Sequence, residues 1–247
     1  MDIILVVDMR VKLEISYVGD EFCGWQIQPE RRTVQGELLR ALKSLTGEEP
    51  IITGSGRTDT GVHALCQVAH FDLTRNFEIK KIKSGLNFYL PQSIRILSAI
   101  EVDESFHARF SAKSKAYEYV FSTSDNALYV SRALYAPDLD YGKMSTALSV
   151  LKGRHDFSAF RSLGSDTKTT VREIFDLSLT AQGEFFVLKV VADGFLYNMV
   201  RKIAGTLIRV GEGKLDADGL HEILLSKDNA RTPVAPAHAL YLSSVEY

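Results

Sequence analysis

The chain has 247 residues, of which 45% are hydrophobic and 24% charged, with 29 Lys and Arg against 31 Asp and Glu. This composition is typical of a globular protein and excludes an intrinsically disordered chain, and the length suits one large domain or two small ones. The formal net charge of -2 at first argues against nucleic-acid binding, which usually requires an excess of cations. Cys23 and Cys66 are too few for a disulfide framework or a four-cysteine zinc site, and they fit a cytoplasmic protein.

The chain begins with eight mostly apolar residues that have neither a basic leader nor a small-residue cleavage site. We therefore expect residues 1–8 to be an N-terminal extension rather than a signal peptide, with Met9 as the natural start. Apolar and polar side chains then alternate from Arg10 to Tyr17, which predicts a strand. No run of about 18 apolar residues occurs, so the sequence predicts no membrane-spanning helix.

Residues 33–100 contain two helical patterns and three further strand patterns. Thr33 can cap a helix whose apolar residues recur at helical spacing: Val34, Leu38, Leu42 and Leu45. Residues 51–53, 66–71 and 94–100 are typical of strands, and a second helix starts near Ile79 with Ile82 and Leu86 facing inward. The order strand, helix, strand, strand, helix, strand predicts a ferredoxin-like α+β domain over residues 9–104.

The second half has a similar outline. The patterns predict strands at residues 115–122, 128–135, 171–179, 185–191 and 240–245, and helices at 141–151, 195–210 and 220–225. Gln182 and Gly183 are expected to form a hairpin turn. The sequence therefore predicts a second α+β domain over residues 105–247, with a cleft shared by the two domains.

The most informative stretch is residues 54–64, Gly-Ser-Gly-Arg-Thr-Asp-Thr-Gly-Val-His-Ala. Its glycines permit backbone conformations that other residues avoid, but their spacing matches neither a phosphate loop nor a dinucleotide fingerprint. The loop presents one carboxylate, Asp59, two residues after the cation Arg57. A carboxylate on such a turn can act as a nucleophile or general base, although an Asx turn around Asp59 accounts for the same residues.

Two other chemistries could use the polar residues of this region. Zinc or iron could bind some of the nearby His and Asp side chains, namely Asp59, His63, His70 and Asp72. The ligand spacing of known zinc helices is lacking, however. Ser55 is a poor candidate for a hydrolase nucleophile because no Gly-x-Ser-x-Gly motif surrounds it.

A second feature is the segment 105–116, which holds Arg109, Lys113 and Lys115 without an acidic residue. Aromatic residues are interleaved with these cations and follow them: Phe106, Phe110 and Tyr117. Cations contact phosphates and aromatic faces stack on unpaired bases, so the segment suits RNA binding. A solvated linker with a few core aromatics is the alternative.

The third feature is the predicted helix 195–210. At about 100° per residue, its apolar face collects Leu196, Val200, Ile203 and Leu207, and its opposite face Asn198, Lys202 and Arg209. Arg201 lies at the border between the two faces. It could pair with a carboxylate and hold it ionised, or its stem could cover apolar surface while its head reaches water.

These residues resemble a known family. Residues 56–64 are similar to the Gly-Arg-Thr-Asp-x-Gly-Val-His signature of the tRNA pseudouridine synthase A family. Further matches follow in the family's order: residues 24–26, 34–35, 106–112, 156–157, 198–201 and 205–207. The resemblance implies the pseudouridine synthase fold, with two ferredoxin-like units around a central cleft. It also implies a cytoplasmic homodimeric enzyme that isomerises uridine to pseudouridine at positions 38, 39 and 40 of the tRNA anticodon stem-loop, without cofactor or metal.

The resemblance also implies roles for individual residues. Asp59 corresponds to the catalytic aspartate, and Arg201 to the arginine that pairs with it. Tyr117 corresponds to a catalytic tyrosine that stacks on the target uracil and can take the C5 proton. Arg57 corresponds to the residue that enters the space left by the flipped base. Leu240 corresponds to an apolar residue that lines the pocket.

The distribution of charge revises the first impression from the net charge. Residues 51–100 carry more cations than acids, whereas residues 1–50 carry more acids than cations. We therefore predict a basic cleft beside Asp59, with Lys80, Lys83 and Arg109 as contacts to tRNA.

Two other classes of function stay open at this point. One is a noncatalytic RNA-binding or chaperone protein on the same fold, and the other is a metal-dependent hydrolase. Salt-sensitive tRNA binding does not separate the first from an enzyme, but conversion of uridine without added metal does. The second requires inhibition by a chelator.

Overall fold

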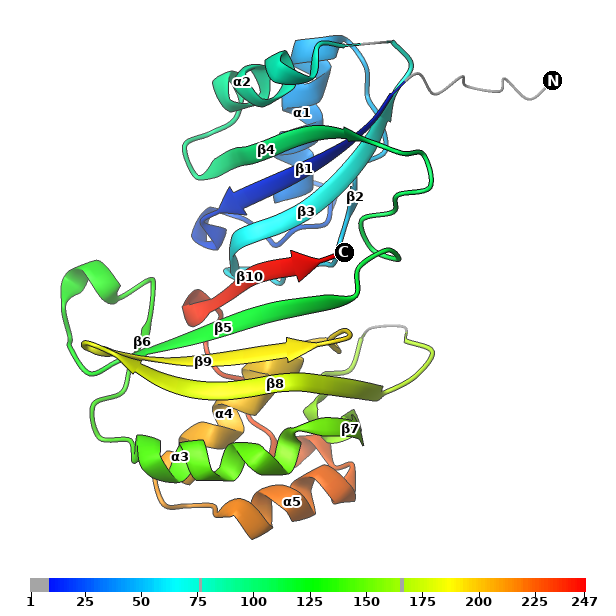
Figure 1. The fold of residues 1–247 in the computed structure, drawn as a ribbon. Coiled ribbons are helices and arrows are strands. Elements are labelled where there is room, and N and C mark those ends of the chain that lie inside the picture. The colour runs from blue at the N-terminus through cyan, green and yellow to red at the C-terminus, as the bar shows by residue number, and fades with distance from the viewer. Residues whose placement is uncertain (1–8, 76, 165–166) are drawn as a thin grey trace. The chain divides into compact units, whose positions relative to one another are not determined.

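The computed structural model describes residues 9–75, 77–164 and 167–247, which pack as two compact units (Figure 1). The first unit extends to Lys113 and includes Leu242–Tyr247, and the second is Ser114–Tyr241. The predicted domains, 9–104 and 105–247, differ from these units because residues 105–113 and the last six residues pack with the first unit. Independent folding of the two predicted domains stays a prediction, and the proposed extension 1–8 lies outside the described residues.

The first unit has the predicted order of strands and helices. Its elements are β1 (Met9–Tyr17), α1 (Val34–Thr46), β2 (Thr53–Gly54), β3 (His63–Leu73), α2 (Ile79–Tyr89) and β4 (Ile94–Val102). β4, β1 and β3 are neighbours in an antiparallel sheet, and β2 also pairs antiparallel with β3. This is the ferredoxin-like arrangement that the sequence predicts.

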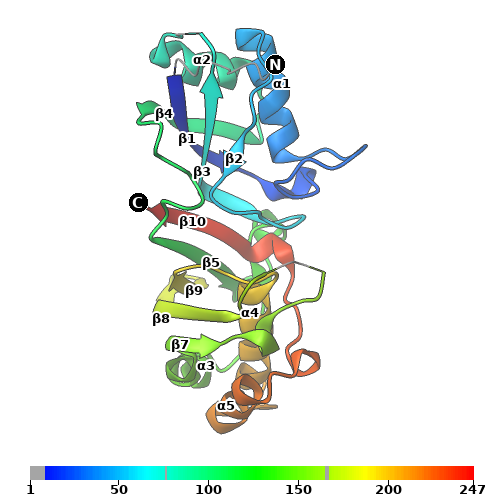
Figure 2. The same cartoon turned by 90° about the vertical axis from the view of Figure 1, so that its right-hand side faces the viewer.

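The core of the first unit lies between this sheet and the two helices, which cover one of its faces (Figure 2). Alternate residues of β1 are buried, as the sequence pattern predicts. The N-cap of α1 is Thr33, whose hydroxyl accepts the Gly36 N–H at 3.3 Å. The predicted strand 51–53 is wrong at its start, because Ile51 is 87% exposed and pairing begins only at Thr53.

The second unit is also α+β. Its elements are β5 (Ser114–Ser122), β6 (Leu134–Tyr135), α3 (Tyr141–Ala147), β7 (Gly153–Asp156), β8 (Val171–Gln182), β9 (Phe185–Ala192), α4 (Met199–Gly211) and α5 (Ala217–Ser226). The strand order β5-β9-β8-β7 is antiparallel, and β6 adds to β5 in parallel. The helices gather on one face of this sheet (Figure 1).

Three details of the second unit differ from the sequence prediction. The predicted strand 128–135 is wrong, because Leu128 and Val130 are exposed and only Leu134–Tyr135 pairs with β5. β7 was not predicted. The β8–β9 turn is centred on residues 183–184 rather than 182–183, with Gly183 at φ +62°, where glycine is favoured.

The helix predicted over 195–210 begins later and has a different buried face. Asn198 has φ +60°, so the helix starts at Met199. Lys202 is buried rather than solvated, because its Nζ donates to the carbonyls of Asn229 and Thr232 and to the Thr232 hydroxyl. A polar side chain can occupy a buried helix position when distant segments supply its acceptors.

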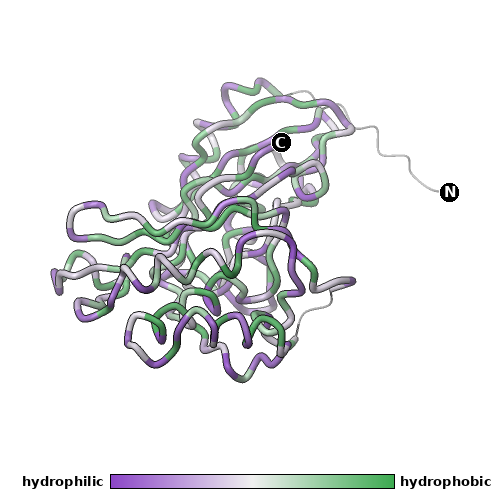
Figure 3. The backbone as a smooth tube through the Cα atoms, turned by 60° about the horizontal axis from the view of Figure 1, so that its bottom comes forward, coloured by the Kyte–Doolittle hydropathy of each residue, from purple (hydrophilic) through white to green (hydrophobic). Residues whose placement is uncertain are grey.

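Hydrophobic and hydrophilic stretches are mixed along the backbone (Figure 3). Among the described residues, no helix is long and apolar enough to span a bilayer. The last strand, β10 (Leu240–Glu246), follows the second unit and contributes its end to the first.

Residues 104–113 are fastened to the first unit although they contain no helix or strand. The Arg10 guanidinium donates to the carbonyls of Glu104 and Phe106 and forms an ion pair with Asp72. Three further hydrogen bonds anchor the segment: Ala108 N to His70 Nδ1 at 3.1 Å, Tyr247 Oη to the Ala108 carbonyl at 2.7 Å, and Lys113 N to the Glu246 carbonyl at 2.8 Å. These anchors explain why the segment belongs to the first unit.

The anchor His70 should make folding stability depend on pH. Burial, with the nearby charge of Arg10, lowers the pKa of His70 to about 4 from its ordinary 6.5. Because the folded-state pKa is the lower one, the contribution of His70 to stability is present above pH 6.5 and is lost as the pH falls toward 4. We expect the free energy of unfolding to fall by about 1 kcal/mol more between pH 6 and pH 5 in the wild type than in His70→Asn.

Urea unfolding of both proteins at each pH measures this difference. Asparagine keeps an acceptor for the Ala108 N–H and removes the titrating ring, so the comparison isolates protonation. Equal pH slopes in the two proteins would contradict the assignment.

Candidate functional site

The loop between β2 and β3 carries Asp59 and Arg57. Asp59 is half-buried, whereas Arg57 is exposed. The Val62 N–H donates to the Asp59 carbonyl at 3.1 Å, which closes a turn over residues 59–62. Gly61 occupies the third position of this turn with φ +78°, a conformation that favours glycine. The turn therefore fixes the backbone on the C-terminal side of Asp59.

A neighbouring segment supports the same loop from the side. The Trp25 N–H donates to the Thr58 carbonyl at 3.0 Å, and the Gly19 N–H donates to His63 Nδ1 at 2.9 Å. Gly24 has φ +82°, and a Cβ there would lie 2.6 Å from the Thr58 carbonyl oxygen. The two backbones can approach this closely only because residue 24 is glycine.

A buried polar network also holds the loop. The Tyr17 and Thr58 hydroxyl oxygens are 2.7 Å apart, and burial raises the pKa of Tyr17 to about 12. Gln67, which is fully buried on β3, accepts from the Ser55 hydroxyl at 2.6 Å and donates to the Gly56 carbonyl at 3.0 Å. Sequence reasoning missed this network, although a glutamine inside an apolar strand was a signal for it.

The catalytic role that the family resemblance implies for Asp59 predicts that Gln67→Leu impairs catalysis more than tRNA binding. Leucine removes the hydrogen bonds that Gln67 makes with the buried Ser55 hydroxyl and the part-buried Gly56 carbonyl, so we expect the free energy of unfolding to fall by about 1–3 kcal/mol. Because the loop then loses one of its supports, kcat should fall roughly 10- to 100-fold, whereas the KM for tRNA should change little. Steady-state kinetics and urea unfolding measure the two effects.

Gln35→Leu is the matched control for this variant. Gln35 is also a buried glutamine of the first unit, with one accepted and one donated hydrogen bond to the backbone, but its partners are Ile27 and Ile52 rather than the loop. It should lose similar stability and retain kcat. An equal loss of kcat in both variants would restrict Gln67 to folding stability.

The predicted tRNA contacts of the first unit lie at its surface. Lys80 and Lys83 are exposed on α2, and the Lys83 ammonium donates to the Leu97 carbonyl at 2.6 Å. Arg109 is exposed after β4, with its guanidinium 5.6 Å from the Phe110 ring. The basic cleft beside Asp59 stays a prediction.

Tyr117 lies on β5 of the second unit and is 8% exposed. Its ring meets the Phe195 ring edge to face, with centroids 5.0 Å apart. Tyr119 is two residues along the strand and therefore shares its face. Burial raises the pKa of Tyr119, and the charge of Arg201 partly offsets this increase. Tyr117 and Tyr119 therefore lie on the same side of β5.

The guanidinium of Arg201 is held in place by acceptors of the second unit. Its Nε donates to the Ala235 carbonyl at 2.7 Å, and its Nη1 donates to Asn198 Oδ1 at 2.9 Å. Asn198 in turn donates to the Ser162 hydroxyl at 3.0 Å. The head group of Arg201 is therefore bonded to protein acceptors, and its pairing with a carboxylate stays a prediction. Asn198, which sequence reasoning placed only on a polar helix face, orients the arginine.

The predicted site residues divide between the two units. Asp59 and Arg57 share one loop of the first unit, whereas Tyr117 and Arg201 belong to the second. Leu240 starts β10 and is 5% exposed. An ion pair between Asp59 and Arg201 would join residues of different units and stays a prediction.

The side chains that suggested a metal site or a hydrolase have other partners. His63 and His70 each accept a backbone N–H through Nδ1, and Asp72 forms an ion pair with Arg10. Over the described ranges, no group of three or more His, Cys, Asp or Glu residues could hold a metal ion. Ser55 is fully buried, which does not suit a nucleophile that must meet a substrate.

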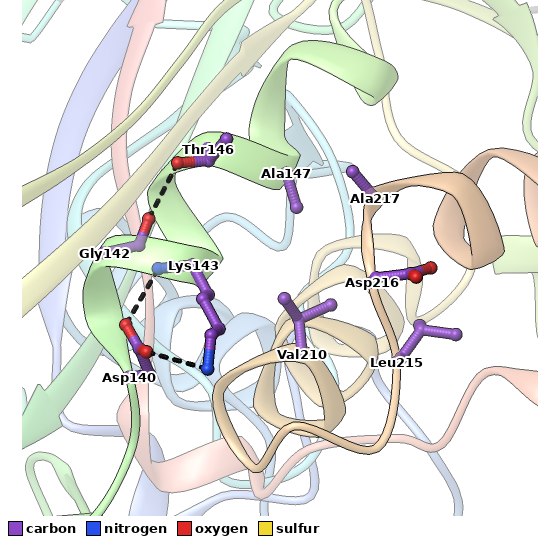
Figure 4. Close-up of a pocket in the computed structure, with 9 residues that line it drawn as sticks. All are labelled: Asp140, Gly142, Lys143, Thr146, Ala147, Val210, Leu215, Asp216 and Ala217. Carbon is purple, nitrogen blue, oxygen red and sulfur yellow. Dashed lines mark hydrogen bonds and ion pairs between the residues drawn. The ribbon is translucent and has the colours of Figure 1, made fainter.

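A pocket of about 390 Å³ lies in the second unit, between α3 and the start of α5 (Figure 4). Two of its carboxylates act as helix N-caps, because Asp140 accepts the Lys143 N–H at 2.9 Å and Asp216 accepts the Gly219 N–H at 2.8 Å. The Lys143 ammonium is paired with Asp140 at 3.1 Å. None of the predicted site residues lines this pocket.

Known proteins are similar to this chain over most of its length. The family model described as "tRNA pseudouridine synthase" matches residues 15–111 and 147–247. A protein of Acetivibrio thermocellus named tRNA pseudouridine synthase A is 45% identical over 242 residues, which cover 96% of this chain and 99% of that protein. A protein of Bacillus pumilus with the same name is 43% identical over 245 residues, which cover 97% and 99%. A solved Cbf5-Nop10-Gar1 complex matches with a TM-score of 0.35 and 11% identity over 84% of this chain and 55% of that chain.

Proposed function

Because the chain belongs to the tRNA pseudouridine synthase family, we propose that it isomerises uridine to pseudouridine in the anticodon stem-loop of tRNA, at positions 38, 39 and 40. The observation that carries this proposal for the chain itself is the half-buried Asp59. Its loop is fixed by a turn, by the neighbouring segment 17–25 and by the buried Gln67.

The reaction breaks the N1–C1′ glycosidic bond, turns the uracil and joins C5 to C1′. The C5 proton is lost and N1 gains one, so substrate and product contain the same atoms and no redox change occurs. Such a reaction needs a carboxylate that can attack the sugar or base or move a proton. It also needs a pocket that keeps the detached uracil in place.

Each proposed residue has a distinct task in this scheme. Asp59 is the catalytic carboxylate, and attack at C1′, attack at C6 and action as a base are all open to it. Arg201 pairs with the carboxylate, keeping it ionised and oriented. Tyr117 stacks on the uracil and can take the C5 proton. Leu240 lines the apolar wall of the pocket, and Arg57 fills the space that the flipped nucleotide leaves.

The energetics of base flipping explain why cations are needed away from the reacting atoms. Turning a nucleotide out of its stack costs a few kcal/mol. Stacking on one aromatic ring returns about 1–3 kcal/mol. Phosphate contacts must supply the rest of the binding energy, and Lys80, Lys83 and Arg109 are the proposed sources.

We further propose that the enzyme is a cytoplasmic homodimer that binds one tRNA across both subunits. This part of the proposal is supported by the family and not by the chain's own contacts. Light scattering of the purified protein should give twice the mass of the chain, 27.5 kDa. A monomer at micromolar concentration would contradict it.

Release of tritium tests the activity directly. A tRNA transcript labelled at C5 of uridine loses the label when C5 joins C1′, so the purified protein should release tritium without added metal or nucleotide. Pseudouridine should appear at positions 38–40 of the same transcript.

The same assay separates the other function classes. A noncatalytic RNA-binding protein would bind the transcript without releasing tritium. A metal-dependent hydrolase would lose activity with a chelator, whereas the proposed isomerase would not.

A further inference from the structure

Residues 106–110 present an aromatic surface that the proposed catalytic roles do not use. Phe110 is 76% exposed, although the segment around it is fastened to the sheet at several points. Its ring lies against the His107 ring, with centroids 4.3 Å apart and planes tilted by 30°. The His107 ring in turn lies 4.9 Å from that of the buried His70. The rings of His70, His107 and Phe110 are therefore in contact one after another, from the core of the first unit to solvent.

The His107 ring, on which the exposed Phe110 ring lies, is held in place by hydrogen bonds. His107 Nδ1 accepts the N–H groups of Arg109 and Phe110, both at 3.2 Å, which fixes the orientation of the imidazole ring. The Ser111 N–H closes the turn by donating to the His107 carbonyl at 2.9 Å. A surface that is already ordered loses little conformational entropy when a ligand binds to it.

The charges around Phe110 select the kind of ligand. The Arg109 guanidinium lies 5.6 Å from the Phe110 ring, Lys113 is exposed nearby in the chain, and residues 105–113 contain no acid. An apolar protein partner would use the ring but would gain nothing from the two cations. An unpaired nucleotide uses the ring and the cations, because its base stacks on an aromatic face and its phosphate binds a cation.

We infer that Phe110, backed by His107, is a stacking platform for an unpaired tRNA base other than the target uridine, and that Arg109 contacts the adjoining phosphate. The inference rests on the proposed function, because it takes tRNA as the ligand. It adds a binding subsite in the first unit that is separate from the stacking role of Tyr117.

Binding measurements on Phe110→Ala test the platform. The dissociation constant for an unmodified tRNA transcript should rise roughly 5- to 100-fold, as for the loss of one stacked base. The melting temperature should stay unchanged, because the ring is exposed, and kcat at saturating tRNA should change little. Phe175→Ala is the matched control, since it removes another exposed phenylalanine, 45% exposed, from β8. It should bind tRNA like the wild type.

Phe110→Trp supplies a direct spectroscopic signal. The chain has a single tryptophan, Trp25, which is 1% exposed, so a second indole at position 110 reports on the platform. Its fluorescence should be quenched as tRNA is added, with the same midpoint as binding, and its affinity should equal or exceed that of the wild type. With excitation selective for tryptophan, wild-type fluorescence comes from Trp25 and should change little.

Three results would overturn the inference: wild-type affinity in Phe110→Ala, no quenching of the new indole by bound tRNA, or a change of oligomeric state in Phe110→Ala without a change in tRNA affinity. The last would make the ring a protein–protein contact. Failure of the proposed function is a separate result, because tRNA binding and indole quenching need no pseudouridine formation.

Discussion

Asp59→Asn should lower the rate of pseudouridine formation by roughly 10³-fold or more while leaving tRNA affinity close to that of the wild type. Asparagine has nearly the shape of aspartate, but it can neither attack the sugar or base nor accept a proton at neutral pH. The backbone around position 59 is fixed by the 59–62 turn and by the Thr58 contacts, so the substitution should leave the loop in place. Single-turnover tritium release with enzyme in excess measures the chemical step.

Asp125→Asn is the matched control, because it removes an exposed aspartate from the second unit. It should react at the wild-type rate. If Asp59→Asn reacts as fast as this control, Asp59 has no catalytic role, and the interpretation of the loop as an ordinary Asx turn becomes the better one.

Arg201→Lys should lower kcat by about 10²-fold with only a modest loss of tRNA affinity. The arginine is oriented by two donated hydrogen bonds, to the Ala235 carbonyl and to Asn198 Oδ1. Lysine keeps the positive charge, but it is a point charge that cannot reproduce this planar, multiply anchored geometry. A carboxylate that depends on the arginine for orientation should therefore lose activity even though the charge is retained.

The comparison with Arg209→Lys makes this result specific. Arg209 lies on the same helix, α4, and its Nη1 donates to the Arg231 carbonyl at the surface, at 3.3 Å. We expect kcat in this variant to match the wild type. Equal losses of kcat and affinity in Arg201→Lys would instead assign Arg201 to RNA binding.

Local sequence patterns predicted most elements because their causes are local. The cap at Thr33, the alternation along β1 and the apolar spacing of α1 and α2 each depend on residues a few positions apart. The predicted strand 128–135 was wrong because, within that range, only Leu134 and Tyr135 pair with a strand, β5. Strand pairing depends on distant partners, which periodicity does not reveal.

The same distinction explains the candidate site. The glycine-framed loop made Asp59 a candidate nucleophile or base, and the family resemblance gave it a role. The residues that support it were missed, because Tyr17 meets Thr58 across 41 positions in the chain. Helical periodicity places Lys202 opposite the apolar face, because nothing near it in sequence indicates that Asn229 and Thr232 bury it.

Mass-spectrometric mapping of pseudouridine in tRNA from cells with and without this protein tests the central claim most directly. Pseudouridine at positions 38, 39 and 40 should disappear when the protein is removed. It should return with the wild-type protein and stay absent with Asp59→Asn. An unchanged map after removal, or full restoration by Asp59→Asn, would contradict the proposal that this chain forms pseudouridine through Asp59.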